Sequence, residues 1–394
     1  MSSVRRPLRV ALIADFREEQ WPSMDLIAET IVDRLGASHR DQIDPTLVRP
    51  PMPHRFARFA PRSQRLHNAD RLMGRLIDYP LAIRRIRSDF DILHIVDHSY
   101  AHLVHYLPAD RTIVTCHDLD TFRCLLTPES ERRSELFRAM TRRILSGLQS
   151  AAAVACVSNA IRDQLLRLAL LPADRVAVVH NGVSAAFTPT ADARADAEIS
   201  RLLGPVDPQA IELLHVGSTA PRKRLDLLLR VFAGARNYWP AARLIRVGGG
   251  FTHDQEVLAG SLGLHDAIAI MPRLDKQVLS AIYRRATLLL ITSESEGFGL
   301  PMVEALACGT PVLASRIAPL LEVGGAAAEY APVGDIDAWV TKVNQLLGER
   351  AAEDTRWAAR AAAGRSRANE FSWDAAVAKL VDIYRAVIAG TGIR

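Results

Sequence analysis

Short runs of apolar residues alternate with longer amphipathic stretches along most of the chain. Most of the runs are too continuously apolar to have a face in water, which predicts parallel strands covered by helices on both sides. Strands that alternate with helical segments form βαβ units, so the pattern predicts an α/β protein with two doubly wound sheets. The predicted strands are Leu8–Asp15, Asp91–Val96, Thr112–Cys116, Ala152–Val157 and Val176–Val179 in the first half, and Glu212–Val216, Arg243–Val247, Ala267–Met271, Thr287–Thr292 and Pro311–Ala314 in the second.

A stretch rich in proline, aspartate and glycine separates the two groups of predicted strands. It includes Phe187-Thr-Pro-Thr-Ala-Asp and, further on, Leu203-Gly-Pro-Val-Asp-Pro, a composition typical of a domain boundary. A length of 394 residues also favours two domains. We therefore predict one domain over residues 1–190 and a second that begins near residue 205.

The composition restricts the class of protein. The formal net charge is only +5, which is too small for an obligate nucleic-acid binder. No run of 18 or more apolar residues is present, so no membrane-spanning helix is predicted, and the run Val10–Ile13 is too short for the core of a signal peptide. Four cysteines without a C-x-x-C pair favour reduced thiols. We therefore expect a cytoplasmic protein.

The positive charge is concentrated in one part of the chain. Residues 45–90 hold ten arginines and three acidic residues, a local charge of +7, and without them the chain carries −2. Apolar residues are interleaved with these arginines. Two interpretations remain open: a surface that meets anionic lipid head groups or a phosphorylated lipid carrier, and an ordinary solvated helical face. The first would place the protein peripherally on the inner face of the membrane.

The motifs of two common nucleotide-binding folds are absent. After the first predicted strand, Asp15-Phe-Arg-Glu-Glu-Gln has no glycine where a dinucleotide-binding G-x-G-x-x-G belongs. Val247-Gly-Gly-Gly ends another strand but lacks the spacing, and no G-x-x-x-x-G-K-[ST] occurs. A nicotinamide-dependent dehydrogenase and a nucleoside triphosphatase are therefore not predicted.

The segment from Thr292 to Val312 is the richest in candidate chemistry. It begins at the carboxyl end of a buried strand, where ligands bind in doubly wound folds. Pro301 suits the first position of a short helix and Gly309 the residue after its end, so free N–H groups at the helix start would face an anion such as phosphate. Glu296 and Glu304 can accept hydrogen bonds from sugar hydroxyls. From spacing alone, a solvated strand–loop–helix explains these residues equally well.

A second candidate loop follows another predicted strand. Val216-Gly-Ser-Thr-Ala-Pro-Arg-Lys-Arg ends in three consecutive cations, Arg222, Lys223 and Arg224. Cations before a helix oppose its dipole unless an anion is present. We therefore favour a diphosphate as the ligand of this loop over a solvated helix start.

Four sequence motifs occur in a recognisable order along the chain. They are His180-Asn-Gly-Val, the loop that begins at Val216, Glu296 with Glu304 in an E-x7-E pattern, and Phe371-Ser-Trp before a final helix. In this order they resemble the retaining glycosyltransferases of family 4 (glycosyl transferases group 1). The resemblance covers about 200 residues, nearly all of the second domain and the end of the first.

The resemblance implies the GT-B architecture, in which two doubly wound Rossmann-like domains face each other across a cleft. Residues 1–190 would form an N-terminal acceptor-binding domain and residues 205–372 a C-terminal domain that binds a sugar nucleotide. Residues 373–394 would form a C-terminal helix that packs back on the N-terminal domain.

The resemblance also implies roles for individual residues. Glu304 resembles the carboxylate that binds the ribose hydroxyls, and Glu296 resembles the group that holds the transferred sugar. Lys223 resembles the cation on the diphosphate. An arginine usually follows Gly217 in the family, but this chain has Ser218 there, so Arg222 or Arg224 would supply the second cation. The residues implied to bind the sugar nucleotide are Gly217, Ser218, Arg273, Leu274, Gly297, Phe298, Gly299, Leu300 and Glu304, and those implied to act in catalysis are His117, Lys223, Arg222 and Glu296.

Histidines are unusually frequent in one part of the first domain. His117 follows a predicted strand and resembles the family histidine that touches the donor sugar. Five of the 12 histidines fall between residues 94 and 117, and their four-residue spacings would suit a metal site. No third ligand converges with them and the family needs no metal, so we expect neither a metal nor a cofactor other than the sugar nucleotide itself. The glycines that the family commonly has after the first strand are absent, so acceptor recognition has the least support.

We therefore predict a metal-independent, retaining hexosyltransferase of polysaccharide biosynthesis. It would move a hexose from a GDP- or UDP-linked donor to a hydroxyl acceptor, either a saccharide or a lipid-linked intermediate. The Pro-Arg-Lys form of the loop at residues 221–223 favours GDP-mannose, with UDP-hexoses a close alternative. Two other functions remain open: a sugar-nucleotide epimerase, which needs no acceptor, and a non-catalytic two-domain sugar-binding protein.

Overall fold

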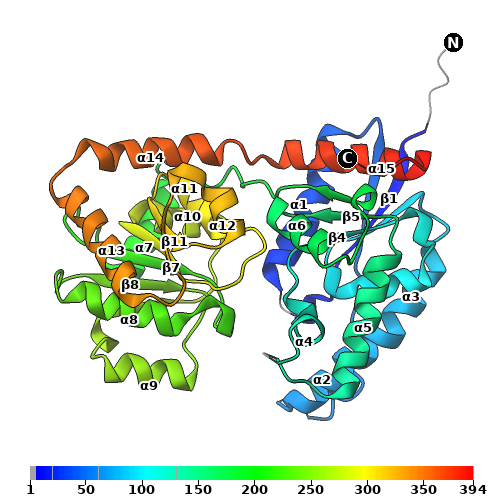
Figure 1. Cartoon of the computed structure of the whole chain (residues 1–394), viewed down its shortest axis with the longest axis horizontal. Coiled ribbons are helices and arrows are strands. Elements are labelled where there is room, and N and C mark those ends of the chain that lie inside the picture. The colour runs from blue at the N-terminus through cyan, green and yellow to red at the C-terminus, as the bar shows by residue number, and fades with distance from the viewer. Residues whose placement is uncertain (1–5, 20, 61, 130, 394) are drawn as a thin grey trace. The chain divides into compact units, whose positions relative to one another are not determined.

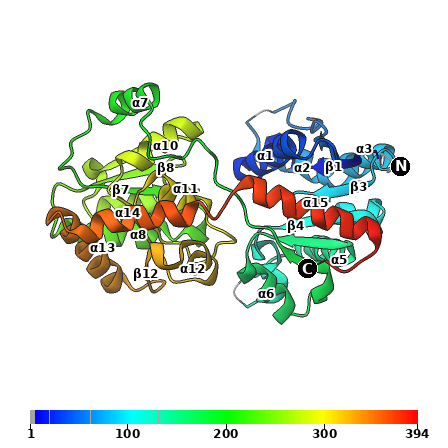
Figure 2. The same cartoon turned by 90° about the horizontal axis from the view of Figure 1, so that it is seen from above.

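The computed structural model describes residues 6–19, 21–60, 62–129 and 131–393, and it consists of two compact units (Figures 1 and 2). The first unit contains residues 1–182 and 373–394, and the second contains residues 183–372. The chain passes from the first to the second unit earlier than the boundary stretch read from the sequence. Part of that stretch forms helix α7 (Ala193–Leu203), whose first turn is capped by the Asp192 carboxylate.

The first unit is built on a parallel six-stranded sheet in the order β2-β1-β3-β4-β5-β6. Five of its strands match predicted apolar runs. The exception is β2, because Asp44 and Pro45 interrupt its apolar pattern; proline is tolerated since β2 is an edge strand. The strands are β1 (Leu8–Ile13), β2 (Ile43–Val48), β3 (Ile92–Ile95), β4 (Thr112–Cys116), β5 (Ala153–Cys156) and β6 (Val176–Val178).

Helices pack on this sheet to form the first core, and the C-terminal helix is among them. The core joins the strands to α3, η3, α5 and α6. Helix α15 packs against α1, and the Tyr384 hydroxyl on α15 lies 2.8 Å from Nδ1 of buried His94 on β3. The prediction that the final helix returns to the first domain is confirmed (Figure 1). The helices and helical turns are η1 (Arg17–Glu19), α1 (Pro22–Ser38), α2 (Gln64–Met73), η2 (Gly74–Asp78), α3 (Tyr79–Ile86), η3 (His98–Tyr106), η4 (Ala109–Arg111), η5 (Asp120–Phe122), α4 (Arg123–Leu126), α5 (Glu135–Ser150), α6 (Asn159–Arg167), η6 (Ala173–Arg175) and α15 (Trp373–Ala389).

The second unit repeats the design with a second parallel sheet in the order β12-β11-β10-β7-β8-β9. Its core joins the strands to α8, α9 and α13. The edge strand β12 was not predicted because Glu329 and Tyr330 leave its three residues without a continuous apolar run. The strands are β7 (Glu212–Val216), β8 (Arg243–Val247), β9 (Ile268–Met271), β10 (Leu288–Ile291), β11 (Val312–Ser315) and β12 (Glu329–Ala331). Besides α7, the helices and turns are η7 (Pro221–Lys223), α8 (Leu225–Arg236), α9 (His253–Ser261), η8 (His265–Ala267), α10 (Lys276–Arg285), α11 (Leu300–Cys308), α12 (Ala318–Gly324), η9 (Gly325–Ala327), α13 (Ile336–Ala351) and α14 (Thr355–Ala368).

Each sheet has one place where the strand order reverses. In the second unit β7 lies beside β10, and in the first unit β1 lies beside β3. Connections leave these neighbouring strands in opposite directions, which opens a crevice at their carboxyl ends where ligands bind in doubly wound sheets. The predicted doubly wound α/β fold is therefore confirmed, and its strand order marks two places for a site.

Two further features bear on the sequence predictions. All four cysteines, Cys116, Cys124, Cys156 and Cys308, are buried thiols, which agrees with the prediction. Within the described ranges, every helix is too short or too polar to cross a membrane.

Candidate functional site

The loop after β10 turns sharply into helix α11. Gly299 has a φ of +94°, a conformation that glycine adopts without strain, and a Cβ there would lie 2.6 Å from Cδ2 of Leu320. Pro301 stands in the first helical turn and Gly309, with a φ of +82°, follows the last, as predicted. The N–H groups of the first turn of α11 therefore lie at the carboxyl end of β10.

Two loops meet at the reversal point of the second sheet, one after β7 and one after β10. Lys223 Nζ lies 2.5 Å from one carboxylate oxygen of Glu296, and Arg222 Nη1 lies 3.2 Å from the other. The Ser293 hydroxyl also donates to Glu296, at 2.7 Å. Hydrogen bonds from Glu294 N to Arg222 O and from Thr292 Oγ1 to Lys223 O join the two loops. The fold thus brings together three of the four residues implied to act in catalysis.

The charges in this cluster compensate one another. Burial opposes ionisation of Glu296, but Lys223 and Arg222 outweigh it, so the pKa of Glu296 lies below its ordinary value. Glu296 is therefore a carboxylate at neutral pH, and it neutralises cations that would otherwise face an anion.

Glu304 lies on the buried side of α11 in a less polar setting. The Tyr283 hydroxyl donates to it at 2.9 Å, and Tyr283 is itself held by a hydrogen bond from the Thr310 hydroxyl to its carbonyl. Burial raises the pKa of Glu304 to about 7, although Tyr283 and Lys276 lower it. Glu304 is thus partly protonated at neutral pH, and its remaining lone pairs can accept hydrogen bonds from a diol.

The start of the loop after β7 is held by β8. Gly217 N donates to Val247 O at 3.0 Å, and Gly217 O accepts from Nη1 of Arg246 at 2.7 Å. Arg224, one of the two candidates for a second cation, instead forms two hydrogen bonds with Asp226, at 2.9 and 2.8 Å. Of the two candidates, Arg222 is the one that joins the cluster.

Other residues implied to bind the sugar nucleotide are spread along the same edge of the sheet. Gly297 and Phe298 are buried, and the Phe298 ring packs on Phe371 with 5.5 Å between centroids. Arg273 is exposed and Leu274 half-buried; both follow β9, which β8 separates from β7. The fold therefore places Arg273 and Leu274 at the carboxyl edge of the same sheet but does not bring them to the Glu296 cluster.

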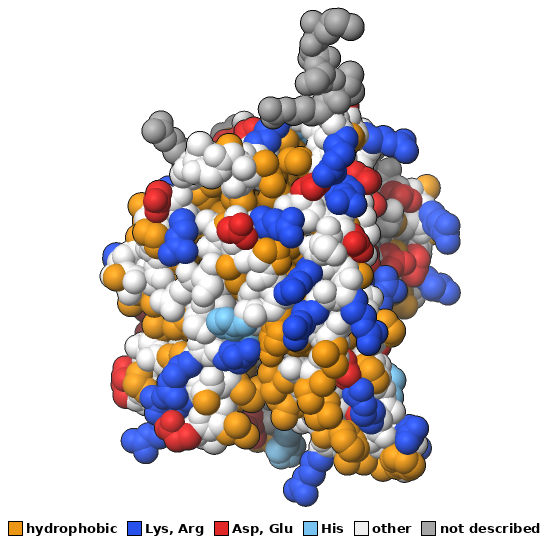
Figure 3. Space-filling view, turned by 90° about the vertical axis from the view of Figure 1, so that its right-hand side faces the viewer, with side chains coloured by type: hydrophobic (Ala, Val, Ile, Leu, Met, Phe, Trp, Pro, Cys, Tyr) orange, Lys and Arg blue, Asp and Glu red, His pale blue; other side chains and the backbone are white. Residues whose placement is uncertain are grey.

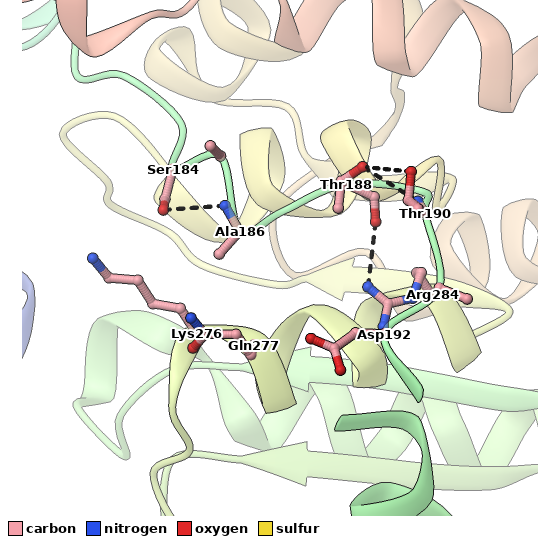
Figure 4. A pocket seen from close by; sticks show the side chains of 10 residues that line it. Ser184, Ala186, Thr188, Thr190, Asp192, Lys276, Gln277 and Arg284 are labelled. Carbon is pink, nitrogen blue, oxygen red and sulfur yellow. Dashed lines mark hydrogen bonds between the residues drawn. The ribbon is translucent and has the colours of Figure 1, made fainter. Parts of the chain in front are cut away.

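A cavity of about 490 Å³ lies between α10 and the segment that enters the second unit. Lys276 and Gln277 at the start of α10 line one side, and Thr188 and Thr190 line the other (Figure 4). Arg284 Nη1 donates to Thr188 O at 3.4 Å. None of the residues predicted for the site lines this cavity, although Lys276 is close enough to Glu304 to lower its pKa.

In the first unit His117 follows β4 and is buried. Its Nε2 lies 2.8 Å from Val96 O, and because a carbonyl can only accept, the proton resides on Nε2. Burial lowers the pKa of His117, against the influence of Asp97. His117 is therefore neutral at pH 7 with an Nδ1 lone pair that can accept a hydrogen bond.

The neighbouring histidines form hydrogen bonds within the first unit. His94 lies between Tyr384 and Thr115, His102 bonds Arg75 O, and Nδ1 of His98 accepts from the backbone of His117. Over the described ranges, no three His, Cys, Asp or Glu side chains converge as a metal site would require.

A buried acidic cluster that was not predicted as a site lies at the β1–β3 reversal of the first sheet. Burial and Asp97 raise the pKa of Asp15 to about 10, whereas the pKa of Asp97 is lowered to about 2, because His98 and the hydrogen bonds from Ser99 outweigh its burial. Asp97 also caps η3 by accepting from Ser99 N. Asp15 could have been noticed as a polar residue at a strand end, but no sequence signal marks the influence of Asp97 on its pKa.

Comparison with solved structures identifies the class of fold. Sucrose-phosphate synthase from Thermosynechococcus elongatus superposes with a TM-score of 0.76 at 19% identity, over 98% of this chain and all of that one. An Anabaena protein, HepE, solved with UDP and glucose, gives 0.69 at 15% identity over 96% and 99% of the two chains. WaaG, a glycosyltransferase of lipopolysaccharide biosynthesis, gives 0.67 at 16% identity over 95% and 99%. The fold is that of the GT-B glycosyltransferases.

Sequence families identify the protein more narrowly. Residues 28–187 match Glycosyltransferase Family 4, and residues 204–363 match Glycosyl transferases group 1. The two matches together cover about four fifths of the chain. The chain belongs to the family 4 glycosyltransferases, with a group 1 domain as its second half, and the resemblance read from the sequence is confirmed.

Curated relatives differ in how much of their length this chain matches. O-antigen chain mannosyltransferase B of Escherichia coli is 29% identical over 81% of this chain and 84% of its own length. The D-inositol 3-phosphate glycosyltransferase of Salinispora arenicola is 36% identical over 55% of this chain and 51% of its own. The chain thus matches only about half the length of the inositol phosphate enzymes.

Proposed function

We propose that this glycosyltransferase transfers a hexosyl group from a nucleoside diphosphate sugar to a hydroxyl acceptor, with retention of anomeric configuration and without a metal. The observation that carries the proposal is the meeting of Lys223 and Arg222 with Glu296 beside the start of α11. Paired cations next to a helix N-terminus suit a diphosphate. Carboxylates among them suit sugar hydroxyls, so the cluster fits a donor with both parts.

The proposed reaction breaks the bond between the anomeric carbon and a diphosphate oxygen. Negative charge then develops on the diphosphate, where Lys223, Arg222 and the N–H groups at the start of α11 would stabilise it. The acceptor hydroxyl attacks on the face from which the diphosphate leaves, and its proton passes to the departing oxygen. No carboxylate nucleophile is required, so Glu296 and His117 would position the sugar.

The remaining site residues would hold the donor. Glu304 would accept hydrogen bonds from the ribose hydroxyls, and the backbone of Gly217 and Ser218 would meet the phosphates. The backbone of residues 297–300 would contact the sugar, and Arg273 with Leu274 the base.

The donor we favour is GDP-mannose. The Pro-Arg-Lys sequence at 221–223 supports it, as does the name of the Escherichia coli relative. The Anabaena neighbour bound to UDP-glucose keeps UDP-hexoses as the alternative. An O-antigen enzyme among the relatives also supports a saccharide or lipid-linked saccharide as the acceptor and polysaccharide biosynthesis as the setting.

A membrane-facing surface on the first unit would serve a lipid-linked acceptor. Leu72, Ile77 and Leu81 on α2, η2 and α3 are exposed apolar side chains, and Phe59 is 74% exposed. Figure 3 shows apolar side chains gathered in the lower part of this face with basic side chains around them. Several arginines of the segment carry no ionic partner within the described ranges, namely Arg58, Arg62, Arg65, Arg84 and Arg85.

Liposome co-sedimentation tests the membrane proposal. The chain should sediment with phosphatidylglycerol vesicles and not with phosphatidylcholine, and R84S/R85S should weaken the binding. The matched variant R194S/R201S, on α7 of the second unit, should bind as the parent chain does. Equal binding by all three proteins would favour the solvated helical face.

The activity is tested by incubating the full chain with labelled GDP-mannose and UDP-glucose. Transfer of label to a saccharide acceptor, with the anomeric configuration read by NMR and the rate unchanged by EDTA, would support the proposal in full. Conversion to another sugar nucleotide without acceptor would favour an epimerase, and binding without turnover a sugar-binding protein. A chain that binds neither donor would contradict all three.

A further inference from the structure

One arginine beneath the loop after β7 is buried without a counter-ion. Arg246 on β8 has no exposed surface. Its Nη1 donates to the carbonyls of Gly217 and Val247, at 2.7 and 2.5 Å. Within the described ranges, its Nε and Nη2 have no hydrogen-bond partner and no carboxylate lies within ion-pair distance.

An uncompensated buried charge is costly for the folded state. The neighbours of Arg246 in the strand, Leu244, Ile245 and Val247, are apolar and almost completely buried, so an apolar residue would suit the position. Burial lowers the pKa of Arg246 to about 10, which still leaves it charged at neutral pH. Features that destabilise the folded state in this way are retained where they contribute to function.

Arg246 lies directly under the candidate phosphate loop. In the β7–β8 register it pairs with His215, and burial, Arg246 and Lys223 together hold the pKa of His215 well below its ordinary value. A Cβ placed on Gly217 would be 3.4 Å from His215 Cε1 and 3.7 Å from Lys223 Cε. The loop after β7 is thus packed together with Lys223, Arg246 and the neutral His215.

The other cations of this loop already have carboxylate partners. Lys223 and Arg222 share Glu296, and Arg224 is bound to Asp226. Ser218, the residue after Gly217, contributes no charge. Within the described loop and its supporting strands, Arg246 is therefore the cation whose charge is left for a ligand.

The hydrogen bond to Gly217 also orients the next amide. No cis peptide occurs in the described chain, and in a trans peptide the carbonyl and the following N–H point in opposite directions. Because Arg246 holds the Gly217 carbonyl, the N–H of Ser218 points away from Arg246.

We propose that Arg246 is a positioning residue for the donor diphosphate: it fixes the Ser218 N–H toward the phosphates and places an uncompensated positive charge beneath them. This inference rests on the proposed function, since it assigns a further residue to the same nucleotide site. It predicts that Arg246 strengthens nucleotide binding at the expense of fold stability.

Calorimetric titration of the full chain with GDP and with UDP, together with thermal melting, tests the inference. R246M keeps the length and removes the charge, so its Kd for the nucleotide should rise about tenfold or more while its melting temperature stays equal or rises. R246K keeps the charge and should bind within about threefold of the parent. S218R/R246M returns a guanidinium to the loop and should recover most of the affinity.

Arg285 provides the matched control, because this buried arginine is paired with Glu212 at the other end of β7. R285M should melt earlier without changing the Kd for nucleotide. R246M that binds as the parent does, or that melts earlier or fails to fold, would overturn the inference while leaving the proposed function intact. A parent chain that binds neither GDP nor UDP would contradict the proposed function, and the inference with it.

Discussion

At the scale of single residues, the proposed donor site holds opposite charges in contact with one another. Lys223 is 2.5 Å from Glu296, and Arg222 is 3.2 Å from the same carboxylate. A diphosphate must therefore compete with Glu296 for both cations. Each phosphate contact would release the carboxylate, which then becomes available to the hydroxyls of the sugar. In the proposed function, phosphate binding and sugar binding would therefore be coupled through the Glu296 side chain.

Glu296→Gln separates these two steps. The amide keeps the shape but no longer competes for Lys223, so GDP or UDP should bind about tenfold more tightly, since close charge pairs are worth about 1.5 kcal/mol or more. Sugar transfer should fall about 100-fold because the sugar is no longer positioned. Titration calorimetry and initial rates measure the two effects.

A neighbouring carboxylate supplies the control for this change. Glu294 lies in the same loop and pairs with Arg224 at 3.5 Å. Glu294→Gln should alter neither nucleotide affinity nor transfer. If Glu296→Gln instead weakened nucleotide binding, the proposal that Glu296 competes with the diphosphate for the two cations would be wrong.

Glu304 makes the stability of the second unit depend on pH. Its pKa is raised to about 7 from an ordinary value of 4.5, chiefly by burial. The folded state thus holds a proton that the unfolded state loses between pH 4.5 and 7, so stability falls as pH rises through this window, by ~3 kcal/mol at most. Glu304→Gln should remove the loss: it should unfold later than the parent in urea at pH 8 and alike at pH 4. Equal stability of the two proteins at both pH values would rule out the buried, partly protonated carboxyl.

At the scale of elements, the turn into α11 depends on one glycine. Gly299→Ala places a Cβ at a φ of +94° and 2.6 Å from Leu320, which should cost about 1–3 kcal/mol and weaken nucleotide binding by shifting the first turn of α11. Gly348 lies in α13 with open space around it. Gly348→Ala should therefore raise stability by about 0.5–1 kcal/mol and leave binding unchanged. Urea unfolding and calorimetry distinguish the two outcomes, and a stable Gly299→Ala protein would contradict the account of this turn.

The elements also show which strands the pattern of apolar and polar residues can predict. The ten predicted strands are all present because each is a mainly apolar run between polar turns, and their ends agree with the structure to within two residues. The two strands that were missed, β2 and β12, lie at sheet edges. An edge strand tolerates polar residues and proline, and β2 contains Asp44 and Pro45 while β12 begins with Glu329. The other two edge strands, β6 and β9, were predicted because their residues are apolar.

The site was predictable only where residues adjacent in sequence carry the chemistry. The E-x7-E segment and the Pro-Arg-Lys loop could be read directly, and the strand order then brings them together. Tyr283 and Arg246 support the site from α10 and β8, and nothing in their local sequence marks them. Their roles depend on burial and on partners about 20 to 30 residues away, which a linear pattern does not contain.

At the scale of the whole molecule, the order of the segments along the chain does not follow the division into two units. The final helix α15 follows the second unit in sequence but belongs to the first. It is held there by apolar packing on α1 and by a buried hydrogen-bonded chain from Tyr384 through His94 to Thr115. Burial holds the pKa of His94 at about 3, so the three hydrogen-bonded side chains are all neutral. Thr115 lies two residues before His117. Helix α15 thus completes the unit that carries His117.

Tyr384→Phe tests this arrangement. Removing the hydroxyl leaves Nδ1 of His94 buried without a partner, which should cost about 1–3 kcal/mol. Because Tyr384 belongs to the first unit, only the melting transition of that unit should move down, by several degrees. The transition that GDP or UDP stabilises, and the affinity for the nucleotide, should stay the same. Tyr238→Phe, at an exposed position of the second unit, should change neither. If Tyr384→Phe lowered the nucleotide-stabilised transition instead, α15 would be supporting the second unit, and the division of the chain would be wrong.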